Sequence, residues 1–265
     1  MAWMLGTAPF GNRPAGRFNK PIAPEGLLYL EQSPKWIRAR LDGEAIVDSK
    51  RARLLHEHLR LPVFLFPEAD VRMDLLRESG RREQDPVKGE QVFWDLAVGD
   101  AVRESAAWRF SEPLLAGLIG LEFGALDEWL EEEEPLLAHP RDPYSRIDVC
   151  PSSRRVRASV DGQVLADSAG TMALFESGLP TRWYFPRDDV RMDLLSPSDT
   201  RTTCAYKGRA DHFSAGEHED VAWTYEDPLH DAQPVQGRIA FYNERVDLEV
   251  DGELAERPQT QWSRD

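Results

Sequence analysis

Five polar residues recur in this chain at one constant separation, and their chemistry suits a site for a small polar molecule. Each lies 119 positions from its counterpart, and the two sets are Ser49, Glu57, Arg72, Asp74, Lys88 and Ser168, Glu176, Arg191, Asp193, Lys207. Cationic side chains bind anions, carboxylates accept protons, and hydroxyl groups donate and accept hydrogen bonds. If these groups converge on one cleft, they supply what a polar ligand requires.

The second set is richer in possible chemistry, so we place the site there. We predict Lys207, Glu176 and Asp193 as the acid–base residues, and the predicted ligand contacts are Tyr184, Arg191, Cys204 and Trp223. Arg191 and Lys207 would hold an anion, Glu176 or Asp193 would act as base, and Tyr184 would stack or donate a proton.

A structural interpretation stays open for each of these residues. In a strand over 190–194, alternation puts Arg191 and Asp193 on one face, where they could form a structural ion pair. Lys207 could be a solvated lysine before a turn, and Trp223 an ordinary core residue. Cys204 could be a buried or incidental thiol, since Lys207 can activate it only if a turn brings the two together.

Metal and cofactor sites are not predicted. His56 and His58 could chelate a metal from one strand face, but the second set has Phe175 and Ser177 there. Aspartates four apart on a strand, such as Asp189 and Asp193, stand about 13 Å apart, too far to share one magnesium ion. Glycine-rich phosphate loops, G-x-S-x-G and H-E-x-x-H motifs do not occur.

Composition restricts the partners and the compartment. The chain has 265 residues and a formal charge of −15, a field that repels nucleic acid and anionic membrane surfaces. Two cysteines cannot build a disulfide framework, and no run approaches the roughly 20 apolar residues of a membrane span. These features predict a cytoplasmic protein whose partner is a small molecule.

The constant separation identifies a tandem duplication. The run Val71–Leu76 recurs letter for letter as Val190–Leu195, and the register slips by four residues only after Gly208. We predict a proline-rich arm over 1–35, a divergent first repeat over 36–130 and an acidic, proline-rich linker over 131–154. The second repeat would cover 155–253 and a tail 254–265, with the two repeats related by pseudo-twofold symmetry.

Local signals within each repeat favour antiparallel strands. Asp42-Gly43 and Asp161-Gly162 are typical of hairpin turns, and β-branched or aromatic runs follow at 182–185, 190–194, 222–225 and 238–242. In the first repeat, 114–130 is apolar enough for a helical turn or two, especially near 126–130. The predicted fold class is all-β with minor helix, in two compact antiparallel barrel-like or sandwich-like domains.

The second repeat resembles the bacterial and fungal domain of unknown function 427, a family also named nucleotidyltransferase-like. The resemblance covers 155–250 closely and 36–130 more loosely, and rests on the ordered strings ESGLP at 176–180, WYFP at 183–186, DVRMDLL at 189–195, CAYKG at 204–208, AWTY at 222–225 and AFY at 240–242. It implies a compact, mainly β domain without a defined activity. The first repeat lacks the cysteine and the Trp-Tyr pair, which implies that activity belongs to the second.

We therefore predict a protein that binds a small polar, anionic metabolite in its second repeat, with acid–base chemistry on that ligand. The alternative is a non-catalytic ligand-binding or scaffold protein. A deep cleft in which Lys207 faces a carboxylate would favour the first interpretation. Solvated and separated groups would favour the second. Nucleotidyl transfer is disfavoured by the spacing of the carboxylates.

Overall fold

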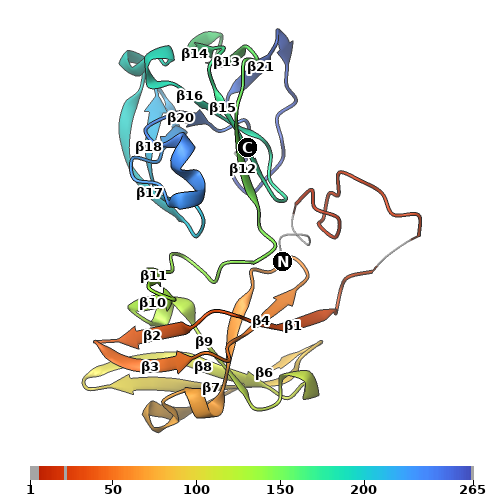
Figure 1. The fold of residues 1–265 in the computed structure, drawn as a ribbon, viewed down its shortest axis with the longest axis vertical. Helices are drawn as coiled ribbons and strands as arrows, with labels where there is room; N and C mark the ends of the chain where they lie inside the picture. Colours follow the sequence, from red (N-terminus) through yellow and green to blue (C-terminus); the bar gives the residue numbers. More distant parts are fainter. Residues whose placement is uncertain (1–5, 21–22, 264–265) are drawn as a thin grey trace. The chain divides into compact units, whose positions relative to one another are not determined.

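The computed structural model describes residues 6–20 and 23–263, and it divides the chain into two compact units (Figure 1). The first unit contains Pro9–Pro143, and the second contains the chain from Tyr144 onward together with Gly6–Ala8. Each unit has one seven-stranded and one four-stranded sheet, and all strand pairs are antiparallel. Two such sheets around one core make a sandwich-like domain, which confirms the predicted all-β class and its duplication.

The first unit has a seven-stranded sheet of order β1-β4-β5-β9-β8-β7-β6 and a four-stranded sheet of order β11-β10-β2-β3. Its strands are β1 (Leu28–Gln32), β2 (Ile37–Leu41), β3 (Glu44–Ser49), β4 (Arg53–Glu57), β5 (Val63–Pro67), β6 (Leu76–Asp85), β7 (Gly89–Val98), β8 (Ala101–Phe110), β9 (Leu118–Leu121), β10 (Glu128–Glu131) and β11 (Glu134–Pro135). Short 3-10 helices connect them: η2 (Glu68–Asp70), η3 (Met73–Leu75), η4 (Pro113–Leu115) and η5 (Phe123–Ala125).

The second unit repeats this topology, with sheet orders β12-β15-β16-β20-β19-β18-β17 and β14-β13-β21-β22. Its strands are β12 (Ile147–Pro151), β13 (Val156–Val160), β14 (Gln163–Ser168), β15 (Met172–Glu176), β16 (Arg182–Phe185), β17 (Ser196–Cys204), β18 (Gly208–Ala215), β19 (His218–Thr224), β20 (Ile239–Phe241), β21 (Asp247–Val250) and β22 (Glu253–Leu254). Its 3-10 helices are η6 (Arg187–Asp189), η7 (Met192–Leu194) and η8 (His230–Val235).

The first hairpin of each unit follows directly from an Asp-Gly pair. Asp42 and Gly43 have φ of 49° and 79°, and Asp161 and Gly162 have φ of 49° and 78°. Positive φ at both central positions is the type I′ turn that matches the twist of the flanking strands. The predicted hairpins are thus confirmed as β2–β3 and β13–β14.

Strand alternation gives the large sheet of the second unit two buried faces. Trp183 and Phe185 of β16 point into the core between the two sheets. Tyr184 points to the opposite face, where it packs with Trp223, Tyr242 and residues of η8. We call this second surface the outer face of the seven-stranded sheet, and the candidate site lies on it.

Two predicted elements are wrong in detail. Residues 190–194 do not form a strand: Val190 makes one isolated bridge to Ala166, and the chain then turns through η7. The Arg191 amide donates to the carbonyl of Leu165, so only the first residues align with β14 before the turn. The helical turns predicted within 114–130 are present as η4 and η5, but residues 128–131 form strand β10, where pairing with β2 satisfies their backbone groups.

Strands also lie within the segments interpreted as arm and linker. β1 pairs with β4, and β12 pairs with β15, each as an edge strand of a large sheet. Edge strands contact a neighbour on one side only, so their sequences need not alternate clearly. No helix within the described residues is long and apolar enough to cross a membrane. The pseudo-twofold relation of the repeats stays a prediction.

Candidate functional site

Lys207 and Glu176 form a nearly buried ion pair at one end of the outer face. Lys207 occupies the three-residue turn between β17 and β18, and Glu176 is the last residue of β15. The Lys207 Nζ donates to Glu176 Oε2, and their side chains are 10% and 9% exposed. Gly208, at φ 101°, allows the tight turn that presents the lysine inward.

The protonation state of Lys207 follows from two opposing effects. Burial is the largest and lowers its pKa, but the charge of Glu176 and the hydrogen bond to it raise the pKa above its ordinary value overall. Lys207 therefore stays an ammonium group at neutral pH. It is not the solvated lysine that the alternative interpretation allowed.

Tyr184 is a neutral hydrogen-bond donor beside this pair. Its side chain is fully buried, and Trp223 Nε1 donates to its hydroxyl oxygen at 3.2 Å. The two rings meet edge to face, with centroids 6.1 Å apart. Burial raises the pKa of Tyr184 to about 12, although Lys207 acts to lower it. Since the oxygen accepts from Trp223, its own proton is free to point elsewhere.

Cys204 completes the group. It is the last residue of β17 and is partly buried, and a negative charge on it would raise the pKa of Lys207. The turn over Ala205–Lys207 therefore does bring thiol and ammonium within electrostatic range. We refer to the five residues that the structure brings together as the Tyr184–Lys207 cluster: Glu176, Tyr184, Cys204, Lys207 and Trp223.

The structure places Arg191 and Asp193 elsewhere. The Arg191 guanidinium donates to both carboxylate oxygens of Asp193, at 2.9 and 2.7 Å, and the side chains are 60% and 62% exposed. The hydrogen bond from Arg191 holds the pKa of Asp193 below its usual range. Their neighbours Val190 and Met192 pack on the core between the sheets, not on the outer face. A surface ion pair that closes the η7 turn accounts for both residues.

The recurring serines have a local structural role. Ser49 Oγ donates to Asp70 at 2.7 Å, and Ser168 Oγ donates to Asp189 at 2.6 Å. Each serine oxygen also accepts from a backbone amide two residues later. Side-chain bonds of this kind stabilise tight turns, so the serines recur because the fold needs them.

Sequence reasoning missed a second buried ion pair on the outer face. The Arg182 guanidinium donates to both oxygens of Glu244 at 2.7 Å, and these side chains are 8% and 0% exposed. Burial raises the pKa of Glu244 most, but the bonds and charge of Arg182 bring it below its ordinary value. Three rings surround the guanidinium, with centroids 5.5 to 5.8 Å away: Trp223, Tyr242 and Trp262. A charged residue two positions before Tyr184 in an otherwise aromatic strand is the signal that could have identified this pair.

His212 extends the polar side of this face. It is 2% exposed, its Nε2 pairs with the Thr202 hydroxyl at 2.8 Å, and its ring stacks on Tyr242. Its Nδ1 has no hydrogen-bond partner among the described residues. Burial lowers the pKa of His212, so the ring is neutral at pH 7.

The first repeat builds the same face mainly from apolar residues. Leu65 occupies the position that corresponds to Tyr184 of the second repeat. In the same way, Val63 corresponds to Arg182, and Phe110 corresponds to Tyr225. Leu55, Leu65 and Leu115 are buried there as a small aliphatic core. The lysine pair and the tryptophan recur. Lys88 Nζ donates to Glu57 Oε2 at 2.5 Å, over the ring of Phe110, and Trp108 lies where the second repeat has Trp223.

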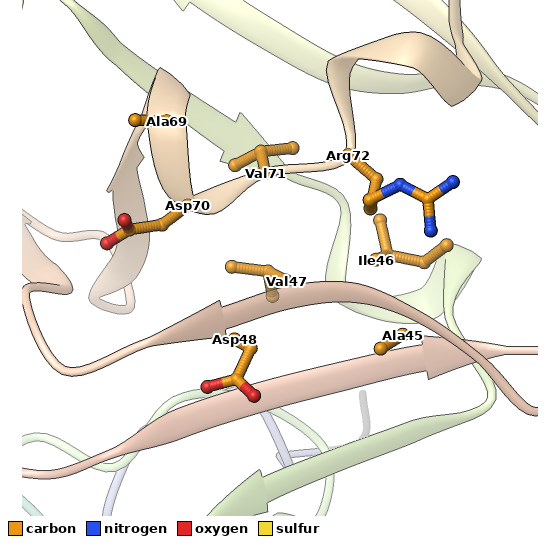
Figure 2. Close-up of a pocket in the computed structure, with 8 residues that line it drawn as sticks. All are labelled: Ala45, Ile46, Val47, Asp48, Ala69, Asp70, Val71 and Arg72. Atoms are coloured by element: carbon orange, nitrogen blue, oxygen red, sulfur yellow. The ribbon is translucent and has the colours of Figure 1, made fainter.

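A pocket of about 310 Å³ lies in the first repeat, between β3 and the η2–η3 segment (Figure 2). Its polar side chains, Asp48, Asp70 and Arg72, do not converge (Figure 2). Asp70 binds Ser49 and Arg51, Arg72 binds Asp74 and Glu44, and Asp48 accepts from Trp36. The pocket is the groove where η2–η3 crosses the edge of β3, and it offers no unpaired acid or base.

A comparison with known families matches both repeats. The family model described as "Domain of unknown function (DUF427)" matches residues 29–131 and 148–252. Both ranges start within the edge strands β1 and β12, so these strands are part of the repeated domain. No curated protein matches the chain. In the described residues, no group of three or more His, Cys, Asp and Glu side chains is arranged to hold a metal ion.

Proposed function

Because the chain belongs to the DUF427 family, whose description gives no activity, we propose its function from the geometry of the second repeat. The second repeat binds a small polar, anionic metabolite at the Tyr184–Lys207 cluster. Acid–base chemistry on that ligand, with Tyr184 as proton donor and Glu176 as base, is the catalytic part of the proposal.

The contrast between the two outer faces carries this proposal. Burying hydroxyl, ammonium and carboxylate groups costs free energy unless each is paired, and the net gain from such pairs is small. Leu65 and Phe110 show that the same sheet forms with an apolar face. Folding therefore does not require the hydroxyl groups of Tyr184 and Tyr225, and a ligand is the remaining reason to place them beside Lys207.

Charge and protonation support the ligand class. Lys207 is an ammonium group at neutral pH, which attracts anions, and Tyr184 keeps its proton because its pKa is about 12. Glu176 offers a carboxylate in contact with the ammonium. A ligand with an anionic group and a polar group next to it would compete for Lys207 and accept from Tyr184.

A scaffold function is the second candidate, and the recurrence of the lysine pair favours it. Lys88 and Glu57 make the same contact in a repeat that has Leu65 in place of the tyrosine, so the pair alone stabilises the fold. Nucleotidyl transfer is not proposed, since Asp189 binds Ser168 and Asp193 binds Arg191.

A thermal-shift screen against a metabolite library tests the proposal. A ligand at 100 times its Kd stabilises the native state by about 2.7 kcal/mol, enough to raise Tm by several degrees. The shift should disappear in Tyr184→Phe, which keeps the ring, and persist in Leu65→Met, which alters the corresponding position of the first repeat. Hits that shift Tyr184→Phe as strongly as the wild type would favour the scaffold function.

A further inference from the structure

The chain after β22 returns to cover the outer face of the second repeat. Residues 251–257 are all exposed, and Pro258, Thr260, Trp262 and Ser263 are then partly buried. Gln259 and Gln261 between them are exposed. We call Pro258–Ser263 the strap. It lies beyond the family-matched range, which ends at residue 252.

The strap closes over the Arg182–Glu244 ion pair. Thr260 Oγ1 donates to Glu244 Oε1 at 2.6 Å, and Arg245 Nε donates to the carbonyl of Trp262 at 3.0 Å. The Trp262 ring centroid lies 5.5 Å from the Arg182 guanidinium. Side chains of one short segment thus complete the burial of two charged groups.

This covered pair is continuous with the Tyr184–Lys207 cluster. The guanidinium of Arg182 is 5.6 Å from the Trp223 ring, and Tyr242 packs on that ring at 4.4 Å. Trp223 in turn donates its hydrogen bond to Tyr184. The strap therefore covers one end of a connected row of aromatic and charged groups whose other end is Lys207.

We propose that the strap opens as a local unit and controls access to this row. Short segments held by a few side-chain contacts, and connected through exposed backbone, open at lower free energy than the sheets they cover. Tyr184 has no exposed surface in this structure, so a ligand can reach the row only if part of the outer face opens. The role in access depends on the proposed function, whereas the opening itself does not.

Site-resolved labelling of arginine by phenylglyoxal measures the opening directly. Arg191, which is 60% exposed, serves as the fast internal reference in the full-length protein. Arg182 should react more slowly than Arg191, at a rate that does not change in low urea, because a local opening exposes little new surface. Trp262→Ala should speed the labelling of Arg182 by at least about tenfold, since it removes an aromatic contact of the closed strap. Gln261→Ala, at an exposed strap position, should leave the rate unchanged.

Two results would overturn the proposal. One is an Arg182 labelling rate that rises with urea in parallel with global unfolding. The other is an unchanged rate in Trp262→Ala. Thr260→Val, which removes only the hydroxyl bond to Glu244, provides a milder variant if Trp262→Ala does not fold. The assay contains no metabolite, so it tests the opening separately from the proposed function. If Arg182 labelling behaves as predicted and the metabolite screen finds no ligand, the proposed function fails and the opening stands.

Discussion

Replacing Arg182 by methionine should destabilise the second unit less at low pH than at neutral pH. In the wild type, the bonds from Arg182 hold the pKa of Glu244 below its ordinary value. This pairing contributes stability that is present above the unfolded pKa and is lost as pH falls through the folded one. Arg182→Met leaves Glu244 fully buried without its cation, so the contribution of Glu244 to stability should then fall, rather than rise, as pH increases.

The magnitude follows from the cost of neutralising the carboxylate. Breaking one partner of a buried ion pair costs about 3–5 kcal/mol. A glutamate with an unfolded pKa near 4.3 can escape that cost by taking a proton, which requires about 4 kcal/mol at pH 7 and about 1 kcal/mol at pH 5. The loss caused by Arg182→Met should therefore shrink by about 3 kcal/mol between pH 7 and pH 5.

Urea unfolding at pH 5, 6 and 7 measures this dependence. The transition of the first unit, which does not contain Arg182, is the internal control. In the double variant Arg182→Met with Glu244→Gln, the stability loss relative to the wild type should no longer shrink at low pH, because no titrating group is left in the pair. A loss below about 1 kcal/mol at pH 7, or one that is equal at all three pH values, would show that water reaches Glu244 and that the face is not closed.

Further measurements probe other parts of the fold. Tyr184→Phe should cost about 1–3 kcal/mol, since it leaves the buried Trp223 Nε1 without its acceptor, as urea unfolding would show. Burial lowers the pKa of His212, so the stability contributed by its neutral ring is present above about pH 6.5 and is lost as pH falls. His212→Phe introduces the residue that the first repeat has at Phe93. The variant should lose less stability than the wild type between pH 7 and pH 5, as urea unfolding would show. Gly162→Ala should lower stability by about 1–2 kcal/mol, because alanine is strained at φ 78°, and an unchanged urea midpoint would contradict the turn. The charge of −15 predicts no salt-sensitive retention of duplex DNA in a gel shift.

The fold was predictable where local signals agreed with tertiary structure. Asp161-Gly162 fixes a turn through its own backbone preferences, and the apolar alternation of β13 fixes the buried side of that strand. The segment 190–194 was wrongly predicted as a strand, because the same alternation of side chains also fits a single bridge followed by a 3-10 turn. Periodicity over five residues does not distinguish these cases, and the deciding contact, Arg191 to Leu165, is not local.

The candidate site was predictable only in part, for a physical reason. Internal recurrence selected Glu176 and Lys207, which do meet, but it also selected Arg191 and Ser168, which recur because turns need them. Recurrence reports what both repeats require, whereas Arg182 has valine as its counterpart and so gave no such signal. Its partner Glu244 is 62 residues away, a pairing that only the topology of β16 and β20 reveals.

The two repeats together separate folding from function more sharply than either does alone. Their inner cores use matching residues, such as Phe66 with Phe185 and Val71 with Val190. On their outer faces, Val63 and Leu65 of the first repeat are replaced by Arg182 and Tyr184 in the second, although the strand order beneath is the same. A core with paired buried charges is no more stable than an apolar one of similar volume, so stability does not explain the change. The outer face of the second repeat, with its strap, is therefore where chemistry specific to this protein should be sought.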